Sequence, residues 1–146
     1  MAQRLTRLLL DTSVLIAGVE AVELNPDDTA AISIITIGEL RAGVQLARDD
    51  PDTHALRQAR LAAVRDTFEP LVVDEPVAEQ YGEILAAARA QSRTSKATDL
   101  LIIATAAASG RALLTLDDAQ QGLARLAGVP VRDRPTDAGN ETTYLT

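Results

Sequence analysis

Short apolar runs recur along this chain between longer segments with helical spacing, and this alternation constrains the fold most. Residues 8–10 are three consecutive leucines, and residues 112–116 read Ala-Leu-Leu-Thr-Leu. Continuous apolar runs of this length are typical of strands buried on both faces of a parallel sheet. We predict strands at residues 5–10, 31–35, 71–73 and 112–116, with an edge strand at 128–131. Strands that alternate with helices predict an α/β fold, here a three-layer α/β/α sandwich with a mainly parallel central sheet.

The segments between these runs carry helix signals. Apolar spacing predicts helices over residues 14–22, 36–48, 56–68, 77–90 and 119–127. The almost wholly apolar run 100–109 predicts a central, buried helix that Gly110 ends in the left-handed conformation. Thr12 or Ser13 is available to cap the first helix, and residues 36–39, Thr-Ile-Gly-Glu, fit a capping box. We predict one domain over residues 1–132 and a polar, flexible C-terminal tail over 133–146.

The amino-acid composition of the chain argues against several classes of function. The chain has no cysteine, which excludes disulfides, thiolate zinc sites and a cysteine nucleophile. Its one histidine, His54, lies in a polar stretch and is a poor candidate for a catalytic base. A net charge of -7 and only three aromatic residues argue against a basic, base-stacking nucleic-acid platform. Because Asp11 interrupts the apolar start, we expect a cytoplasmic protein with no membrane partner.

Four acidic residues stand where an apolar strand run gives way to a helix, or within a turn of that point: Asp11, Glu39, Asp99 and Asp117. In a parallel sheet such positions converge on one crevice at the carboxyl ends of the strands. Carboxylates gathered there would take up protons unless a cation lies among them. Mg²⁺ or Mn²⁺ suits an all-oxygen site. The pattern predicts a metal-dependent phosphodiester hydrolase.

Each acid also has a purely structural explanation. Asp11 is favoured by the dipole of the helix that it begins, although its position directly after three leucines is costly for capping alone. Glu39 fits the third position of the capping box. Asp99 precedes a long apolar run that neighbouring polar residues are able to cap, so its carboxylate is expected to face a crevice. Of Asp117 and Asp118, one is expected to cap the following helix and the other to reach a metal.

Further polar residues lie beside these acids in the sequence. Thr115, Ser13 and Asp118 are candidates to support the metal site. The candidates for contacts with a substrate phosphate are basic residues near two of the acids: Arg41, Arg93 and Lys96. A solvated position on a helix surface explains each basic residue equally well.

Four segments occur in a characteristic order. They read Asp-Thr-Ser-Val-Leu-Ile at 11–16, Gly-Glu-Leu-Arg-Ala-Gly-Val at 38–44, Thr-Asp-Leu-Leu-Ile-Ile-Ala-Thr-Ala at 98–106 and Leu-Thr-Leu-Asp at 114–117. This series closely resembles the PIN-domain family, especially its short bacterial members, the VapC-type toxins of toxin–antitoxin pairs. The resemblance extends over residues 8–131.

The resemblance implies a Mg²⁺- or Mn²⁺-dependent endoribonuclease that uses metal-activated water, is commonly homodimeric and is neutralised by a cognate antitoxin. By position, Asp11 and Asp99 match the family's principal metal ligands, Glu39 its acid on the second helix and Asp117 its acid after the late strand. Many relatives follow that late acid with another acid and an aromatic residue. Here Asp118 is present but no aromatic follows. We expect an antitoxin arginine to bind against Asp11 and Asp99, because an acidic pocket attracts a guanidinium as well as a metal.

Two other functions stay open. A phosphatase that forms an aspartyl phosphate needs a second Asp two residues after the first, where this chain has Ser13. A phosphoacceptor receiver needs paired acids on its first strand and a lysine at a later strand end, and Lys96 is the only lysine. Another Mg²⁺-dependent phosphoryl hydrolase therefore fits less well. The last alternative is a non-catalytic PIN-like module that binds a partner, although such a scaffold has no need to gather like charges.

Overall fold

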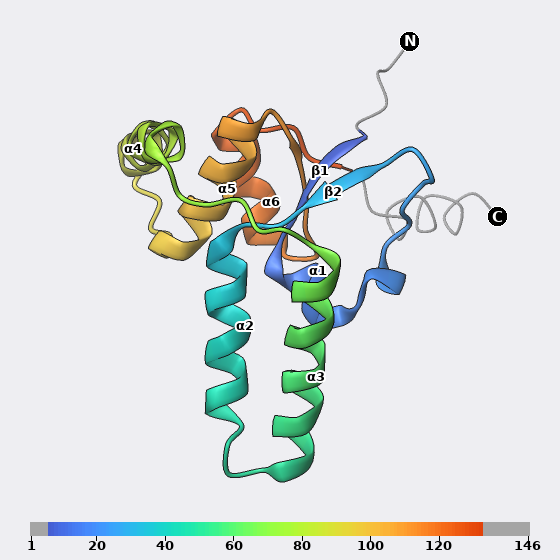
Figure 1. Cartoon of the computed structure of the whole chain (residues 1–146). Helices are drawn as coiled ribbons and strands as arrows, with labels where there is room; N and C mark the ends of the chain where they lie inside the picture. The colour runs from blue at the N-terminus through green and yellow to red at the C-terminus, as the bar shows by residue number, and fades with distance from the viewer. Residues whose placement is uncertain (1–5, 133–146) are drawn as a thin grey trace, which may run out of the picture.

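The computed structural model describes residues 6–132, so the predicted tail at 133–146 lies outside the described residues. Six α-helices and a short 3₁₀ helix surround a three-stranded sheet within this range (Figure 1). In chain order the elements are β1 (Arg7–Leu10), α1 (Thr12–Ala17), η1 (Val19–Ala21), β2 (Thr29–Ala31), α2 (Ile34–Leu46), α3 (Pro51–Thr67), α4 (Glu75–Ala90), α5 (Ala97–Ser109), β3 (Ala112–Leu114) and α6 (Asp118–Leu126). No helix of the described range is long and apolar enough to span a bilayer.

The sheet is parallel, with the strand order β2-β1-β3. Leu8 at its centre pairs with Ala30 on one side and Ala112 on the other. The predicted strands at 71–73 and 128–131 are reduced to single parallel bridges, one from Leu71 and one from Val131. A proline directly precedes each of these bridge residues, and because proline has no backbone N–H it cannot extend a ladder as a donor.

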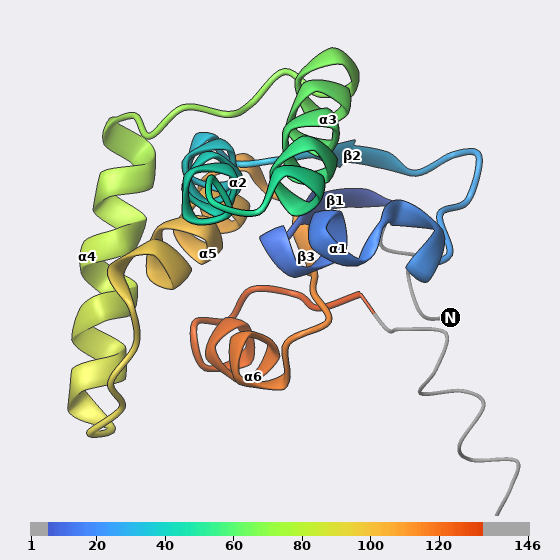
Figure 2. The same cartoon turned by 90° about the horizontal axis from the view of Figure 1, so that it is seen from below.

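The alternation of the three leucines in β1 assigns each one to a face of the sheet. Leu9 packs in a cluster with residues of α4, α5 and α6, whereas Leu8 and Leu10 pack in a second cluster with residues of α1, α2 and α3. All three side chains are fully buried, and burying a leucine contributes roughly 1.5–3 kcal/mol. Figure 2 shows α2 and α3 on one side of the strands and α6 on the other. The predicted three-layer α/β/α fold is confirmed.

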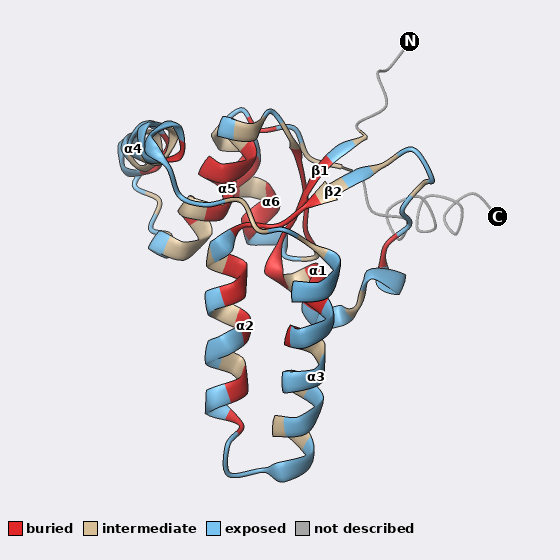
Figure 3. Ribbon diagram, in the orientation of Figure 1, coloured by how far each residue is buried: buried red, intermediate tan, exposed pale blue. Residues whose placement is uncertain are grey.

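Helices α2 and α3 form an antiparallel pair that extends away from the sheet, with their buried residues on the sides that face each other (Figure 3). Asp50 caps α3, because its side chain accepts a hydrogen bond from the N–H of Thr53. Asp74 caps α4 in the same way through Val77. The predicted ending of α5 is confirmed, since Gly110 adopts the left-handed conformation with φ 63°.

Each helix begins earlier than predicted, and the largest difference is at α3, which begins at Pro51 instead of residue 56. The N-cap position of α1 is Asp11, whose side chain makes no capping hydrogen bond, and that of α5 is Lys96. Helix α2 begins after Ser33, whose hydroxyl accepts from the N–H of Ile35 at 3.0 Å. The predicted strand at 31–35 therefore ends at Ala31, because Ser33 supplies a helix cap two residues later.

Candidate functional site

The strands of the parallel sheet all end on one side, called the carboxyl edge, where the ends of β1 and β3 lie next to each other. The N–H of Asp11 donates to the carbonyl of Leu114 at 2.9 Å, which fixes the residue after β1 beside the end of β3. Asp11 is buried, with 6% of its surface exposed. Burial of an aspartate requires hydrogen-bond partners, because a desolvated carboxylate is costly.

Two hydroxyl groups supply those partners. Ser13 Oγ donates to Asp11 Oδ2 at 2.9 Å, and Thr115 Oγ1 donates to the same oxygen at 2.7 Å. Each hydroxyl in turn accepts a backbone N–H, that of Leu116 on Ser13 and that of Asp117 on Thr115. A hydroxyl has one proton, so both protons are used on Oδ2. The other carboxylate oxygen of Asp11, Oδ1, is left available for a ligand.

Glu39 is held by a second pair of hydroxyls. Thr12 Oγ1 donates to Glu39 Oε1 at 2.8 Å and lies 2.9 Å from Thr36 Oγ1. Because the Thr12 proton is directed at Glu39, Thr36 must be the donor to Thr12. The capping-box interpretation of Glu39 is wrong, since α2 begins at Ile34 and places Glu39 in its second turn, where it reaches α1.

Sequence analysis missed Thr12 and Thr36 as contributors to the site. Thr36 carried a sequence signal, since it is a threonine within the otherwise apolar run 34–37, whereas Thr12 lies between Asp11 and Ser13 and carried none. Buried hydroxyls require hydrogen-bond partners. Thr36 is fully buried and Thr12 nearly so.

The acids form one electrostatic cluster. Burial raises the pKa of Glu39, against the hydrogen bond from Thr12, and repulsion from Asp99 and Asp11 raises it further. Burial also raises the pKa of Asp99, with repulsion from Asp11 and then Asp117 in the same direction. Lys96 opposes both shifts, so its ammonium group serves as the local counter-charge of the cluster.

A cavity of about 290 Å³ opens beside Asp99. Asp117 lines it and also caps α6, because its Oδ1 accepts the N–H groups of Ala119 at 2.8 Å and Gln120 at 3.1 Å. Both adjacent acids are exposed, but Asp117 is the cap and also lines the cavity, whereas Asp118 is in the first turn of α6 and does not line it. The other residues that line the cavity are Arg93, Thr94, Ser95, Lys96, Ala119, Gln120 and Leu123.

The predicted phosphate-contacting residues separate into two groups. Lys96 and Arg93 line the cavity beside Asp99, where Arg93 Nη2 donates to the carbonyl of Ala119 at 2.8 Å. Arg41 is exposed on α2 and lines neither cavity next to the acids.

Two arginines that the sequence did not single out line a second cavity beside the acids. Arg57 and Arg60 of α3 line this cavity of about 170 Å³ together with Glu39. Arg57 Nη1 donates to the carbonyl of Gly43 at 2.8 Å, which fixes it against α2. Basic side chains therefore share one cavity with Glu39 and another with Asp99 and Asp117.

The donor set suits a hard cation, because the acids and hydroxyls at this edge offer only oxygen. Within residues 6–132, no three His, Asp or Glu side chains are gathered tightly enough to enclose an ion as they stand. Mutual repulsion of the carboxylates provides a physical reason for this spacing. Asp11 Oδ1 and Glu39 Oε2 receive no hydrogen bond from the described residues, so both remain available to a cation.

Comparison with known proteins gives consistent matches. The family model described as PIN domain matches residues 8–127. Ribonuclease VapC4 of Mycobacterium tuberculosis (strain ATCC 25618 / H37Rv) is 40% identical over 116 residues, 77% of this chain and 87% of the relative. Ribonuclease VapC5 of the same strain is 34% identical over 126 residues, 84% of this chain and 92% of the relative.

Solved structures agree with these sequence matches. The crystal structure of VapBC-5 from Mycobacterium tuberculosis, a member of the VapBC family of toxin-antitoxin systems, superposes with a TM-score of 0.70 at 36% identity, covering 81% of this chain and 90% of the other. The crystal structure of FitAcB from Neisseria gonorrhoeae superposes with a TM-score of 0.68 at 28% identity, covering 86% and 96%.

Proposed function

The chain belongs to the PIN-domain family, and from this premise we propose that it is a Mg²⁺- or Mn²⁺-dependent endoribonuclease, the toxin of a toxin–antitoxin pair. The observation that carries the proposal is the gathering of Asp11, Glu39 and Asp99 at one edge of the sheet, where Asp11 is near enough to help raise the pKa of both other acids. A fold gathers like charges at a cost in stability, which is offset when a cation binds among them. Relatives named as ribonucleases supply the substrate class.

The four acids would each bind the metal ion in a different way. Asp11 is the most rigid acid, because two hydroxyls fix its Oδ2 and leave Oδ1 for coordination. Glu39 is oriented by Thr12, and Asp99 and Asp117 complete the set from α5 and from the turn before α6. A bound Mg²⁺ or Mn²⁺ would lower the pKa of an attacking water and stabilise charge on the phosphate. No nucleophilic side chain is required.

The flanking basic residues are proposed to hold the RNA. Lys96 and Arg93 lie beside Asp99, and each offers N–H donors to a backbone phosphate. Arg41 is a weaker candidate, since it is exposed away from the cavity. The overall charge of -7 repels RNA, so these local donors must supply the attraction.

Regulation by a protein partner follows from the same acids. Solved relatives include members of the VapBC family of toxin-antitoxin systems. For this chain we propose a cognate antitoxin that places an arginine against Asp11 and Asp99, and a homodimeric toxin. The arginine would compete with the metal, so the inhibited complex is expected to bind Mn²⁺ more weakly than the free toxin. Unchanged Mn²⁺ affinity in the complex would contradict this mode of inhibition.

Cleavage of RNA tests the proposal. The purified chain, free of any partner, is incubated with total tRNA and rRNA in Mg²⁺, Mn²⁺ or EDTA, beside Asp11→Asn, Asp99→Asn and, as a control, Asp66→Asn on the exposed face of α3. Discrete metal-dependent fragments that disappear only in the first two variants are expected. Binding of Mn²⁺ without cleavage of any RNA would favour another phosphoryl hydrolase. Absence of both would favour a non-catalytic partner-binding module.

A further inference from the structure

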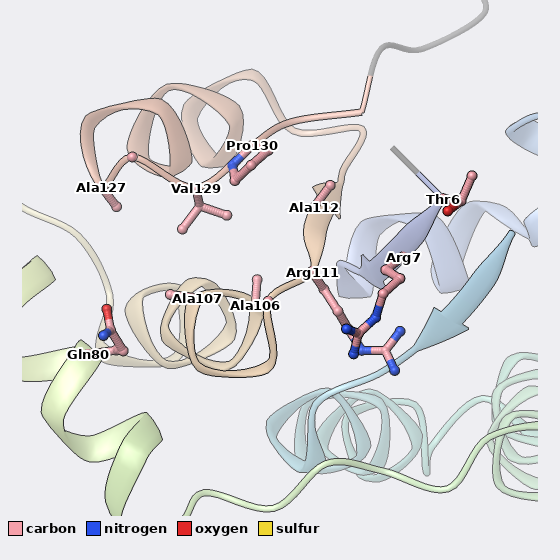
Figure 4. Close-up of a pocket in the computed structure, with 12 residues that line it drawn as sticks. Thr6, Arg7, Gln80, Ala106, Ala107, Arg111, Ala112, Ala127, Val129 and Pro130 are labelled. Carbon is pink, nitrogen blue, oxygen red and sulfur yellow. The ribbon is translucent and has the colours of Figure 1, made fainter. Parts of the chain in front are cut away.

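The opposite edge of the sheet, where the strands begin, carries two arginines. Arg7 is the first residue of β1, and Arg111 directly precedes β3. Leu8 pairs with Ala112, so the register places the two arginines side by side one position earlier. Figure 4 shows their guanidinium groups lying together. Like charges directly opposite each other on neighbouring strands are destabilising.

No carboxylate offsets this pair. Neither Arg7 nor Arg111 forms an ion pair within residues 6–132, where Arg132 pairs with Asp28 instead. Burial lowers the pKa of Arg111, and repulsion from Arg7 lowers it further. The two cations therefore face each other without a counter-charge from the described chain.

Both side chains are held by long hydrogen bonds. Arg111 Nη1 lies 3.3 Å from the carbonyl of Leu8 and 3.4 Å from that of Thr29, and Arg7 Nη2 lies 3.3 Å from the carbonyl of Ser109. Good N–H···O bonds are 2.7–3.2 Å, so these are weak. Arg111 Nε is buried and has no hydrogen-bond partner among residues 6–132. A buried donor without an acceptor is rare in native proteins and calls for an explanation, such as an ion or a water that binds there.

A structural role explains part of this arrangement. Arg7 lies at the C-terminal end of α5, where the helix dipole favours a cation. Arg111 links the carbonyls of two neighbouring strands. Neither role requires two adjacent guanidiniums, and neither gives Arg111 Nε an acceptor.

The arginines lie on the wall of a cavity of about 490 Å³ (Figure 4). Its other walls are mostly small and apolar and contain no carboxylate: Thr6, Gln80, Ala106, Ala107, Gly110, Ala112, Ala127, Gly128, Val129 and Pro130. We propose that Arg7 and Arg111 form a binding site for a phosphate-class oxyanion in this cavity.

A phosphate suits the site better than a carboxylate. One guanidinium satisfies the two oxygens of a carboxylate, whereas two guanidiniums offer donors from two directions to the several oxygens of a phosphate. A dianion also balances both positive charges. Rotation of Arg111 towards the anion would give its buried Nε an acceptor. The source of the phosphate is either the free ion or the backbone of an RNA strand.

Phosphate titration tests the site without involving the carboxyl edge. The full chain in EDTA is titrated with inorganic phosphate against chloride at constant ionic strength, following the melting temperature and the arginine Nε–H resonances. Wild type is compared with Arg7→Gln and with Arg65→Gln, an exposed arginine of α3. Arg7→Gln should weaken phosphate binding about tenfold, the effect of losing one charge-assisted hydrogen bond, and Arg65→Gln should leave it unchanged.

A second measurement, of RNA binding, identifies the source of the anion. Binding of a single-stranded RNA in EDTA is measured at several salt concentrations for the same three proteins. A salt dependence that falls by about one phosphate contact in Arg7→Gln assigns the site to the RNA backbone. Lost phosphate binding with unchanged RNA binding assigns it to the free ion. Equal responses of wild type, Arg7→Gln and Arg65→Gln to phosphate mean an adventitious ion only, and overturn the proposal.

Discussion

The two edges of the sheet carry opposite charge and hold it differently. At the carboxyl edge, Asp11 and Glu39 are fixed by hydroxyl donors at 2.7–2.9 Å. At the opposite edge, Arg7 and Arg111 are held by carbonyls at 3.3–3.4 Å, and one buried N–H has no acceptor. Short bonds to defined partners orient a side chain before a ligand arrives, whereas long bonds leave it free to adjust. The carboxyl edge is thus pre-organised, and the guanidinium edge is adaptable.

The strongest test of this contrast removes the charge at the centre of the rigid edge. Asp11→Asn keeps the shape of the side chain and an acceptor for Ser13 and Thr115, but it loses the negative charge. We expect RNA cleavage to fall about a thousandfold, since the charge that holds the metal supplies several kcal/mol. Cleavage rates and Mn²⁺ affinity measure the effect. Activity within about threefold of the Asp66→Asn control would contradict a catalytic role for this edge.

Positioning at the rigid edge is tested through Thr12. Thr12→Val removes the hydroxyl that fixes Glu39 and should lower metal affinity and activity about tenfold, as loss of a supporting hydrogen bond does. That bond lowers the pKa of Glu39, so the acidic limb of the pH–rate profile should move to higher pH.

Thr12→Ser should restore both the rate and the pH profile, because it restores the hydroxyl. Thr67→Val serves as the control, since Thr67 bonds only within α3, to the carbonyl of Ala63. A rate for Thr12→Ser as low as that of Thr12→Val would contradict this role of the hydroxyl, because Thr12→Ser keeps it.

The adaptable edge is tested by changing geometry while keeping charge. Arg111→Lys retains the positive charge but removes the planar fork and the Nε–H. If the site binds phosphate through several directed donors, affinity in EDTA should fall about tenfold. Phosphate affinity equal to that of the wild type would show that charge alone attracts the anion, and that this edge has no shaped site.

The smallest expected effect concerns stability. The pKa of Asp99 is raised in the folded chain, first by burial and then by Asp11, so the fold disfavours its ionised form. Such a group binds protons more readily when folded, so its contribution to the free energy of unfolding decreases as the pH rises above the ordinary aspartate pKa of 3.8. Asp99→Asn cannot ionise. In EDTA at pH 7 it should melt roughly 1–3 °C higher than the wild type, after allowance for solvent screening.

This gain in melting temperature should disappear at a pH below the ordinary aspartate pKa of 3.8, where Asp99 is protonated in both the folded and the unfolded state. Thermal melts across pH measure it, with Asp66→Asn as the exposed control. A lower melting temperature for Asp99→Asn at pH 7 would show that Asp99 stabilises the fold, and would contradict a cluster of repelling carboxylates.

The sequence alone predicted the buried strand at the centre of the sheet and Asp11 at its carboxyl end, but not that Glu39 lies in the second turn of α2. Three consecutive leucines predicted a strand buried on both faces, and the acid after them was placed at its carboxyl end because chain direction fixes that end. The left-handed conformation of Gly110 was also predictable from the local sequence, because this glycine directly follows the apolar helix run. The first residues of the helices were harder to predict. For α2, Ser33 and Thr36 both carry a suitable hydroxyl, and only packing decides which one becomes the cap.

The partners of the acids could not be predicted, because they lie far apart in the chain. Thr12 and Glu39 are separated by 27 positions, and Asp11 and Thr115 by 104. The pairing of Arg7 with Arg111 depends in the same way on the register of two strands that are distant in sequence.

The sequence by itself determined the α/β/α architecture and which acids stand at strand ends, because strand periodicity and chain direction are local properties. The tertiary structure decided which carboxylate oxygens are occupied by hydroxyls, that Asp117 both caps α6 and lines the acidic cavity, and that two arginines meet at the other edge. Parallel strands pair through long connections, so the neighbours of a charge at a sheet edge depend on the packing of the whole chain.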